Sequence, residues 1–447
     1  MKKNKENNKS KSNILKKILL ILLIIVIAVG VDILINYINT KKREEQKTQK
    51  IAEITSKYND FVKTTKNTTI YQEENNQYSS FGTLSKGIEL ELEKEKITDK
   101  TKYFHIKDSN YYISYKNLEK IKELSKVNTR YKKYIPFNEN IETKNPTKIY
   151  LDEEKYIILN KTYSLPIIIK EEDSYGVELN DRLYFVKKNN VDKTIAKTNS
   201  TAKKKNKIMT LTYHFIYDPK ERKCNQVICQ SLNQFESHLK YIKDNNYLTL
   251  RLNELEMFLD KKINLPYKSV VLTIDDGTIL SKQALRLLEQ YEQYATLFLI
   301  TGSVGKDQFA SPFLDIESHS HDMHTPNKCP GMGLQGGRIL CAKKEEAIAD
   351  LKKSQEILGG SKYFSYPFFD VNNHAVEILK EAGFTMAFIG QYNTNGFSWP
   401  GIDKYRIPRK TVFNTMSMEE FKYLLSWGVK RVWVEEEKRN YAVKYLE

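Results

Sequence analysis

Two adjacent carboxylates, Asp275 and Asp276, end an apolar run and stand directly before a glycine. Residues 270–274, Val-Val-Leu-Thr-Ile, are typical of a buried strand, and α/β sheets and barrels place their chemistry at the C-terminal ends of such strands. Because neighbouring side chains on a strand point to opposite faces, the two aspartates would have separate roles. The same Asp-Asp-Gly sequence is also typical of a turn that only closes the strand.

Three of the seven histidines, His319, His321 and His324, fall within six residues. One aspartate oxygen and two neutral imidazoles form an open three-ligand site for a divalent ion, with Zn²⁺ expected and Co²⁺, Ni²⁺ or Mn²⁺ as alternatives. A second aspartate beside such a site is placed to take a proton from a water molecule that the metal activates. The spacing leaves two pairs open, because His319 and His321 share one face of an extended chain whereas His319 and His324 need a turn.

These residues resemble the polysaccharide deacetylases with a NodB-like domain (carbohydrate esterase family 4). The family's T-F-D-D-G motif corresponds to residues 273–277, Thr-Ile-Asp-Asp-Gly, and its H-[ST]-x-x-x-H motif corresponds to residues 319–324. The resemblance implies that Asp275 is the catalytic base and gives His321 no role. The metal ligands that it implies are Asp276, His319 and His324.

The family's third motif, R-x-P-[FY], matches only in part at residues 365–368, Ser-Tyr-Pro-Phe. Ser365 replaces the arginine that orients the base in the family, and either Arg406 or Arg409 is a candidate to supply that charge. The expected substrate-binding residues are Tyr366, Pro367, Phe368 and Arg409. Further aromatic candidates for stacking on sugar rings are Phe369, Tyr392 and Trp399.

The family's last motif, L-x-x-H, carries the histidine proposed to protonate the leaving amine. It is absent from its usual C-terminal place but present at residues 211–214, Leu-Thr-Tyr-His. Circularly permuted members, the poly-N-acetylglucosamine deacetylases, carry it at that position. The resemblance, which covers residues 208–430, therefore implies that His214 is the general acid; a structural histidine beside Tyr213 is the alternative.

The elements that must position these residues alternate between strands and helices through residues 208–447. Strands are expected at 208–214, 270–276, 295–301, 363–367 and 385–390, and helices at 232–245, 252–259, 280–291, 343–358, 373–382 and 418–427. Repeated β/α units predict a parallel, barrel-like sheet with the site at the C-terminal ends of its strands. The family resemblance implies an α/β fold, a distorted and incomplete (β/α) barrel of the NodB type.

A nearly unbroken apolar run occupies residues 18–38. About twenty helical residues span the hydrocarbon core of a bilayer. Residues 1–17 are a lysine-rich tail, so the positive-inside rule predicts a cytoplasmic N-terminus, a single-pass anchor in the cell membrane and an extracytoplasmic catalytic domain. A cleaved signal peptide is the alternative, because residues 28–30, Ala-Val-Gly, resemble a small-residue cleavage site.

Between the apolar run and the catalytic domain, residues 39–66 are polar and predict a stalk. Short alternating strands then predict two small all-β domains, 67–125 and 130–196, which resemble bacterial SH3-like domains. Residues 197–207 have the composition of a linker. The two β domains either bind the cell wall or act as a spacer that lifts the enzyme off the membrane.

The four cysteines occur as Cys224-x₄-Cys229 and Cys329-x₁₁-Cys341. Outside the membrane, disulfides explain them better than a four-cysteine zinc site, which more often has C-x₂-C spacing. We expect the two local pairs, although four cysteines allow three pairings. The second pair would close a glycine-rich loop, residues 330–337, directly after the histidines.

The net charge of +16 does not indicate a nucleic-acid partner. Residues 1–50 contribute +8, from eleven lysines and one arginine against four acidic residues. The remaining lysines are dispersed, and no arginine-rich helix or aromatic RNA-binding motif is present. This charge suits either a negatively charged envelope or a solvated lysine-rich surface.

The expected function is that of an extracytoplasmic, metal-dependent N-deacetylase, a hydrolase that acts on the acetamido groups of a cell-wall or exported glycan. The SH3-like pattern favours peptidoglycan as the substrate, whereas the permuted motif order favours poly-N-acetylglucosamine. The alternative is a catalytically inactive wall-binding or scaffold protein that retains the deacetylase fold. The missing arginine and the displaced histidine support that alternative, and the complete Asp-Asp and His-x₄-His sets oppose it.

Overall fold

A computed structural model describes residues 3–57, 61–74, 77–93, 103–125, 129–179, 182–197, 207–390 and 395–430. The predicted linker residues 198–206 and the aromatic candidate Tyr392 lie outside these ranges. The chain divides into two compact units, of which one comprises 1–127, 144–162 and 179–184 and the other comprises 128–143, 163–178 and 185–447. Each unit is described by itself below.

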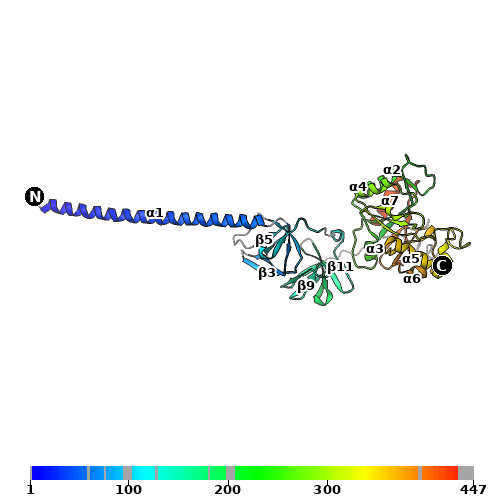
Figure 1. The fold of residues 1–447 in the computed structure, drawn as a ribbon, viewed down its shortest axis with the longest axis horizontal. Coiled ribbons are helices and arrows are strands. Elements are labelled where there is room, and N and C mark those ends of the chain that lie inside the picture. Colours follow the sequence, from blue (N-terminus) through cyan, green and yellow to red (C-terminus); the bar gives the residue numbers. More distant parts are fainter. Residues whose placement is uncertain are drawn as a thin grey trace. The chain divides into compact units, whose positions relative to one another are not determined.

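The first unit begins with one long helix, α1 (Lys3–Lys57), which contains the apolar run (Figure 1). Its stretch Lys16–Lys50 is long and apolar enough to cross a membrane, judged by length and composition alone. The large aliphatic side chains between Ile18 and Ile38 are exposed. A membrane anchor and a signal peptide both have these properties.

The rest of the first unit is an antiparallel β structure. Its strands are β1 (Phe61–Thr64), β2 (Thr68–Glu74), β3 (Gln77–Leu84), β4 (Glu89–Glu93), β5 (Tyr103–Ile106), β6 (Tyr111–Ser114), β7 (Leu118–Lys120), β9 (Thr147–Tyr150) and β10 (Tyr156–Leu159). They are ordered β9-β10-β3-β2-β6-β5-β4-β1-β7. Alternate residues such as Val62, Ile70 and Ile113 face a common core, because successive side chains on a strand point to opposite faces. The all-β pattern is as expected, and the SH3-like identity remains a prediction.

A smaller β segment belongs to the second unit. Its strands are β8 (Glu139–Thr143), β11 (Ser164–Lys170), β12 (Ser174–Leu179) and β14 (Val191–Ala196), in the order β14-β8-β11-β12, while β13 (Arg182–Lys187) spans the unit boundary. Within the same unit, Arg130 donates to the side chain of Glu254, which is buried, and to the carbonyl of Thr249. The segment that precedes the expected linker is thus tied to the part of the chain that follows it.

The part of the chain from residue 207 to 430 is built on a mainly parallel sheet. Its strands are β15 (Ile208–Tyr213), β18 (Leu248–Thr249), β19 (Ser269–Asp276), β20 (Ala295–Leu299), β21 (Leu314–Ser318), β22 (Tyr363–Ser365), β23 (Met386–Ile389), β24 (Phe397–Ser398), β25 (Ile407–Pro408) and β26 (Lys410–Thr411). The order is β24-β15-β19-β20-β21-β22-β23-β25, and only β24 runs antiparallel to its neighbour. Residues on β15, β19 and β20 are buried on both faces, as continuous apolar strands in a covered parallel sheet require.

Helices cover this sheet where the apolar spacing predicts them. They are α2 (Leu232–Asp244), α3 (Leu252–Leu259), α4 (Lys282–Tyr291), α5 (Lys344–Leu358), α6 (Asn373–Ala382) and α7 (Met418–Lys430). Ser231 and Gln234 form a capping box that starts α2, and Gly383 in a left-handed conformation ends α6. Helix α2 packs against α4 and α7, and α5 packs against α6 (Figure 1).

The segment 407–411 pairs with strands near both ends of the parallel sheet. Strand β25 pairs with β23, and two residues later β26 pairs with β15. The residue between them is Arg409, which is fully buried. The expected strands and helices are present, with ends that differ by a few residues, whereas β18, β21, β24, β25, β26 and the two-stranded sheet of β16 (Phe215–Tyr217) and β17 (Cys229–Ser231) were not among the expected ranges.

Candidate functional site

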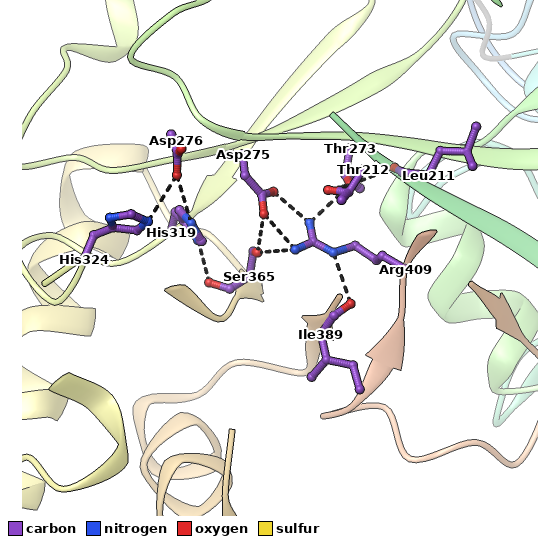
Figure 2. A network of polar contacts seen from close by, with 10 residues as sticks. All are labelled: Leu211, Thr212, Thr273, Asp275, Asp276, His319, His324, Ser365, Ile389 and Arg409. Atoms are coloured by element: carbon purple, nitrogen blue, oxygen red, sulfur yellow. Dashed lines mark hydrogen bonds and ion pairs between the residues drawn. The ribbon is translucent and has the colours of Figure 1, made fainter. Parts of the chain in front are cut away.

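The candidate metal site lies at the C-terminal ends of β19 and β21. The Nε2 atoms of His319 and His324 each lie 3.3 Å from Oδ1 of Asp276 (Figure 2). Among the described residues, these are the three whose ligand atoms all lie within 4.8 Å of one another. Asp276 adopts φ +71°, in the left-handed region, directly after the strand. This turn sends its carboxylate toward the histidines and away from Asp275 (Figure 2).

The three ligand atoms, Oδ1 of Asp276 and Nε2 of His319 and His324, are arranged to bind a cation rather than to form hydrogen bonds with one another. Nδ1 of His319 lies 2.7 Å from the carbonyl oxygen of Ser365, so it carries the proton and leaves the lone pair of Nε2 facing Asp276. Oδ1 of Asp276 is buried and accepts no hydrogen bond of good geometry, and 3.3 Å exceeds the usual length of a charge-assisted hydrogen bond. Lone pairs that face each other in a buried site require a positive charge between them, and one carboxylate with two imidazoles is a set that Zn²⁺ accepts.

The electrostatics of the site also favour positive charge. Burial alone raises the pKa of Asp276, but the contacts with His319 and His324 outweigh it and hold that pKa far below its ordinary value. Burial lowers the pKa of His319, yet the two aspartates outweigh burial and raise it. The pair of carboxylates therefore stabilises a cation at the imidazoles.

The structure brings together His319 and His324, one of the two histidine pairs that the spacing left open. His321 lies outside the cluster, with its Nδ1 3.1 Å from the hydroxyl of Thr301 and its backbone N–H donated to the carboxylate of Asp350. Ser320, at φ +73°, provides the turn that brings His324 back beside His319. The arrangement is the one that the resemblance implied.

Asp275 is held by a buried arginine. The guanidinium of Arg409 donates to both carboxylate oxygens of Asp275, each over 2.7 Å, and Ser365 donates its hydroxyl to Oδ2 over 3.1 Å (Figure 2). Arg409 also donates to the hydroxyls of Thr273 and Ser365. Burial raises the pKa of Asp275, but Arg409 and the neighbouring His319 outweigh it and keep the pKa below its ordinary value. Asp275 is consequently an ionised group that is fixed in place.

Two of the expected substrate-binding residues lie in the interior and not at the surface of the site. Arg409 and Tyr366 are both fully buried, so neither has a surface with which to contact a glycan. Arg409 supplies the charge missing at Ser365, the alternative role considered for it, whereas Arg406 pairs with Asp403 at the surface. Tyr366 packs within the core cluster around Phe364.

His214 lies beside Asp275 because β15 and β19 run in register, with Tyr213 opposite Ile274. Its ring is partly exposed, and its Nδ1 is buried without a hydrogen-bond partner. Burial lowers the pKa of His214 overall, although Asp275 acts in the opposite direction. A protonated His214 would therefore give up its proton readily.

Comparison with known proteins agrees with this geometry. The profile of the family described as polysaccharide deacetylase matches residues 262–387, which include both aspartates and the histidines. The chain contains a polysaccharide deacetylase domain. It is 27% identical over 237 residues to the poly-beta-1,6-N-acetyl-D-glucosamine N-deacetylase of Staphylococcus aureus (strain MRSA252), a match that covers 46% of this chain and 79% of the relative.

Two further similarities are more distant. The putative polysaccharide deacetylase YxkH of Bacillus subtilis (strain 168) is 27% identical over 165 residues, which cover 34% of this chain and 56% of that protein. The solved structure of IcaB from Ammonifex degensii is 22% identical with a TM-score of 0.42, and the match covers 50% of this chain and 97% of that one.

Aromatic rings lie close to the histidines of the site. Phe368 and Phe369 are partly exposed and both have positive φ, at +59° and +62°, while Pro367 before them is buried. The ring of Phe368 lies 4.3 Å from that of His324, and the ring of Phe369 lies 5.8 Å from that of His214. The ring of Trp399 is partly exposed, with the ammonium of Lys207 5.3 Å from its centre.

Both expected disulfides are present in the deacetylase domain. Cys224 pairs with Cys229, and Cys329 pairs with Cys341. The second bond closes the glycine-rich loop that follows the histidines, as the spacing predicted. Within this site, sequence reasoning gave no role to Thr273 or to the hydroxyl of Ser365; the only signal for Ser365 was its place in the third motif.

Proposed function

We propose that this protein is a metal-dependent N-deacetylase that hydrolyses the acetamido groups of poly-β-1,6-N-acetylglucosamine. The observation that carries the proposal is the convergence of Asp276, His319 and His324 next to the ionised Asp275. A divalent ion bound there, for which we propose Zn²⁺, would polarise the acetamide carbonyl and activate water.

Each residue then has one role. Asp276, His319 and His324 hold the ion, and Asp275 accepts the proton of the attacking water, while Arg409 fixes its orientation and keeps it ionised. His214, on the neighbouring strand, donates a proton to the departing sugar amine. Phe368 and Phe369 are proposed to contact the sugar beside the acetamide. The products are acetate and a glucosamine unit.

The choice of polymer rests on the relatives. The Staphylococcus aureus relative bears the name of a poly-β-1,6-N-acetylglucosamine deacetylase, and this chain covers most of its length. The match covers 79% of that relative, and the family profile at residues 262–387 includes Asp275, Asp276, His319 and His324, which supports the same polymer here. Peptidoglycan is the competing glycan that an assay must include.

The remaining architecture is proposed from sequence and topology together. We infer a distorted (β/α) barrel over 208–447, which the pairing of one segment with both β15 and β23 supports. We further infer two SH3-like domains, 67–125 and 130–196, and a helix α1 that anchors the enzyme in the cell membrane with its catalytic part outside. Retention of α1 in the mature protein, read from its intact mass in the membrane fraction, separates an anchor from a signal peptide.

The test is acetate release by the full-length protein in detergent. Substrates are β-1,6-linked N-acetylglucosamine oligomers and purified peptidoglycan, each with and without chelator and with Zn²⁺ restored. Asp275→Asn should lower kcat by about a hundredfold to ten-thousandfold, the usual contribution of a general base. Asp322→Asn is the matched control, because that carboxylate lies between the ligand histidines in sequence yet is 79% exposed.

We expect wild-type protein to release acetate from the oligomers and to stop when chelator is added. Asp275→Asn should abolish this release, and Asp322→Asn should leave it unchanged. Faster acetate release from peptidoglycan would make peptidoglycan the substrate and leave the proposed deacetylation reaction unchanged. No release from either glycan, by folded protein supplied with Zn²⁺ or Co²⁺, would reject the enzyme in favour of an inactive wall-binding protein.

A further inference from the structure

The two ligand histidines are held in place by different means. His319 is 2% exposed, and its Nδ1 donates to the carbonyl of Ser365. The side chain of His324 is 23% exposed, and among the described residues none forms a hydrogen bond with its Nδ1. Ligating histidines almost always donate their second N–H, which fixes the orientation of the ring. His324 therefore depends on packing for its orientation.

Of the two rings among the described residues that pack against His324, that of Phe368 lies nearer than that of His319. The ring centre of Phe368 lies 4.3 Å from that of His324, with the two planes 42° apart. Phe368 adopts φ +59°, an uncommon and unfavourable conformation for a bulky residue. Such a conformation persists only where the surrounding structure determines it.

The surrounding structure is the glycine-rich loop closed by the disulfide between Cys329 and Cys341. Its residue Gly337 lies against Phe368 so closely that an added Cβ would stand 3.3 Å from Cδ2 of that ring. A larger residue at this position would displace either the loop or the ring. The loop therefore packs against the ring of Phe368.

Asp370 organises this loop. Its carboxylate is 1% exposed and accepts the backbone N–H groups of Gly337 over 2.8 Å, of Gln335 over 3.2 Å and of Leu334. Among the described residues no cation pairs with Asp370, so these N–H groups are what compensates its burial. The same carboxylate stands two residues after Phe368, so it joins the loop to the segment that carries the ring.

We propose that Asp370 and Phe368 are positioning residues for the metal ligand His324. The loop wrapped around Asp370 holds Phe368 in its left-handed conformation, and the ring of Phe368 holds the imidazole of His324 toward Asp276. For His324, packing against Phe368 takes the place of the hydrogen bond that His319 donates from its Nδ1. The inference rests on the metal site of the proposed function, but it concerns affinity and geometry rather than turnover.

The test measures metal binding by the full-length protein in detergent. Zn²⁺ affinity is obtained by competition with a chromophoric chelator, and the visible absorption of bound Co²⁺ reports the ligand geometry. Loss of partners that orient a ligand typically weakens metal binding by about ten- to a hundredfold, so we expect this loss for Asp370→Asn and for Phe368→Leu, together with an altered Co²⁺ spectrum. Phe368→Tyr keeps the ring and should restore affinity to within about threefold of wild type.

Two controls separate the possible causes. Met332→Ser changes an exposed side chain on the same loop and should leave Zn²⁺ affinity unchanged. His324→Ala removes the ligand itself and sets the largest loss. Circular dichroism of the metal-free variants shows whether the fold is kept, and if Asp370→Asn unfolds, Phe368→Leu and Phe368→Tyr still decide the question.

The outcomes are distinct. Wild-type protein that binds no Zn²⁺ would overturn the proposed metal site, and the inference with it. Wild-type binding with folded Phe368→Leu and Asp370→Asn variants of equal affinity and unchanged Co²⁺ spectrum would overturn the positioning role and leave the metal site intact.

Discussion

The ion pair between Arg409 and Asp275 yields a prediction whose size can be worked out from its burial. Both side chains are almost completely inaccessible, at 0% and 1%, and the guanidinium reaches both carboxylate oxygens over 2.7 Å. Removing one partner of a buried pair leaves an uncompensated charge and costs about 3–5 kcal/mol, whereas replacing both partners is far less costly. The two single substitutions should therefore be strongly non-additive.

The perturbation is a double-mutant cycle of Arg409→Met and Asp275→Asn. We expect each single variant to lose about 3–5 kcal/mol of unfolding free energy, and the double variant to lose less than the two losses together by about 3 kcal/mol or more. Arg406→Met is the control, since its guanidinium lies at the surface, and it should cost about 1 kcal/mol or less.

The assay must resolve the catalytic unit, because a chain with two compact units need not unfold in one step. Denaturant-dependent amide hydrogen exchange, read in peptides that cover β19, gives the free energy of opening for that unit in the full-length protein. Chelator is present throughout, so that metal binding does not contribute. Additivity of the two substitutions within about 0.5 kcal/mol would refute the claim that Arg409 chiefly compensates Asp275.

Three further predictions concern stability. Burial lowers the pKa of His238 to about 4. The free energy of unfolding should therefore be full above pH 6.5 and fall by about 3 kcal/mol as the pH drops from about 6.5 to about 4. Unfolding measured against pH should show this slope in wild type and not in His238→Gln. Gly277→Ala should lower the thermal midpoint, because its φ is +78° and the added carbon would lie 2.5 Å from Cδ1 of Leu299; an unchanged midpoint would contradict this. Arg130→Met leaves Glu254 buried without its cation, so it should cost about 3 kcal/mol of unfolding free energy, and adding Glu254→Gln should recover part of the loss; an unchanged stability of Arg130→Met would contradict this.

The strands and helices that carry the site were predictable because local patterns determine them. The apolar run before Asp275 could only be a buried strand, and its end had to lie at the edge where parallel strands place their side chains. Capping residues such as Ser231 and Gly383 fixed the ends of helices to within a few positions. These features depend on neighbours in sequence, which is why composition and spacing were sufficient.

The partner of Asp275 was not predictable in this way. Arg409 stands 134 positions after Asp275, between two strands of two residues each, and such short strands leave no periodic pattern. Only the missing arginine at Ser365 signalled that a charge must come from elsewhere, and spacing could not choose between Arg406 and Arg409. The burial of Tyr366 was hidden for a similar reason, because a tyrosine beside Pro367 fits a core and a sugar site equally well.

The unusual backbone conformations at the site have a common physical origin. Consecutive residues on a strand point to opposite faces, yet the chemistry needs Asp275 and Asp276 to face two different partners at one edge. A positive φ at Asp276 turns the chain within one residue, and a positive φ at Ser320 and at Phe368 does the same after β21 and β22. Each of these residues costs free energy in this conformation, so the disulfide-closed loop, the buried Arg409 and the packed strands must supply the compensating contacts. It follows that a substitution which relaxes one of these turns should stabilise the fold and weaken metal binding at the candidate site. Phe368→Gly relieves the strain and removes the ring, so it should show both changes: a higher free energy of unfolding in chelator and a lower affinity for Zn²⁺.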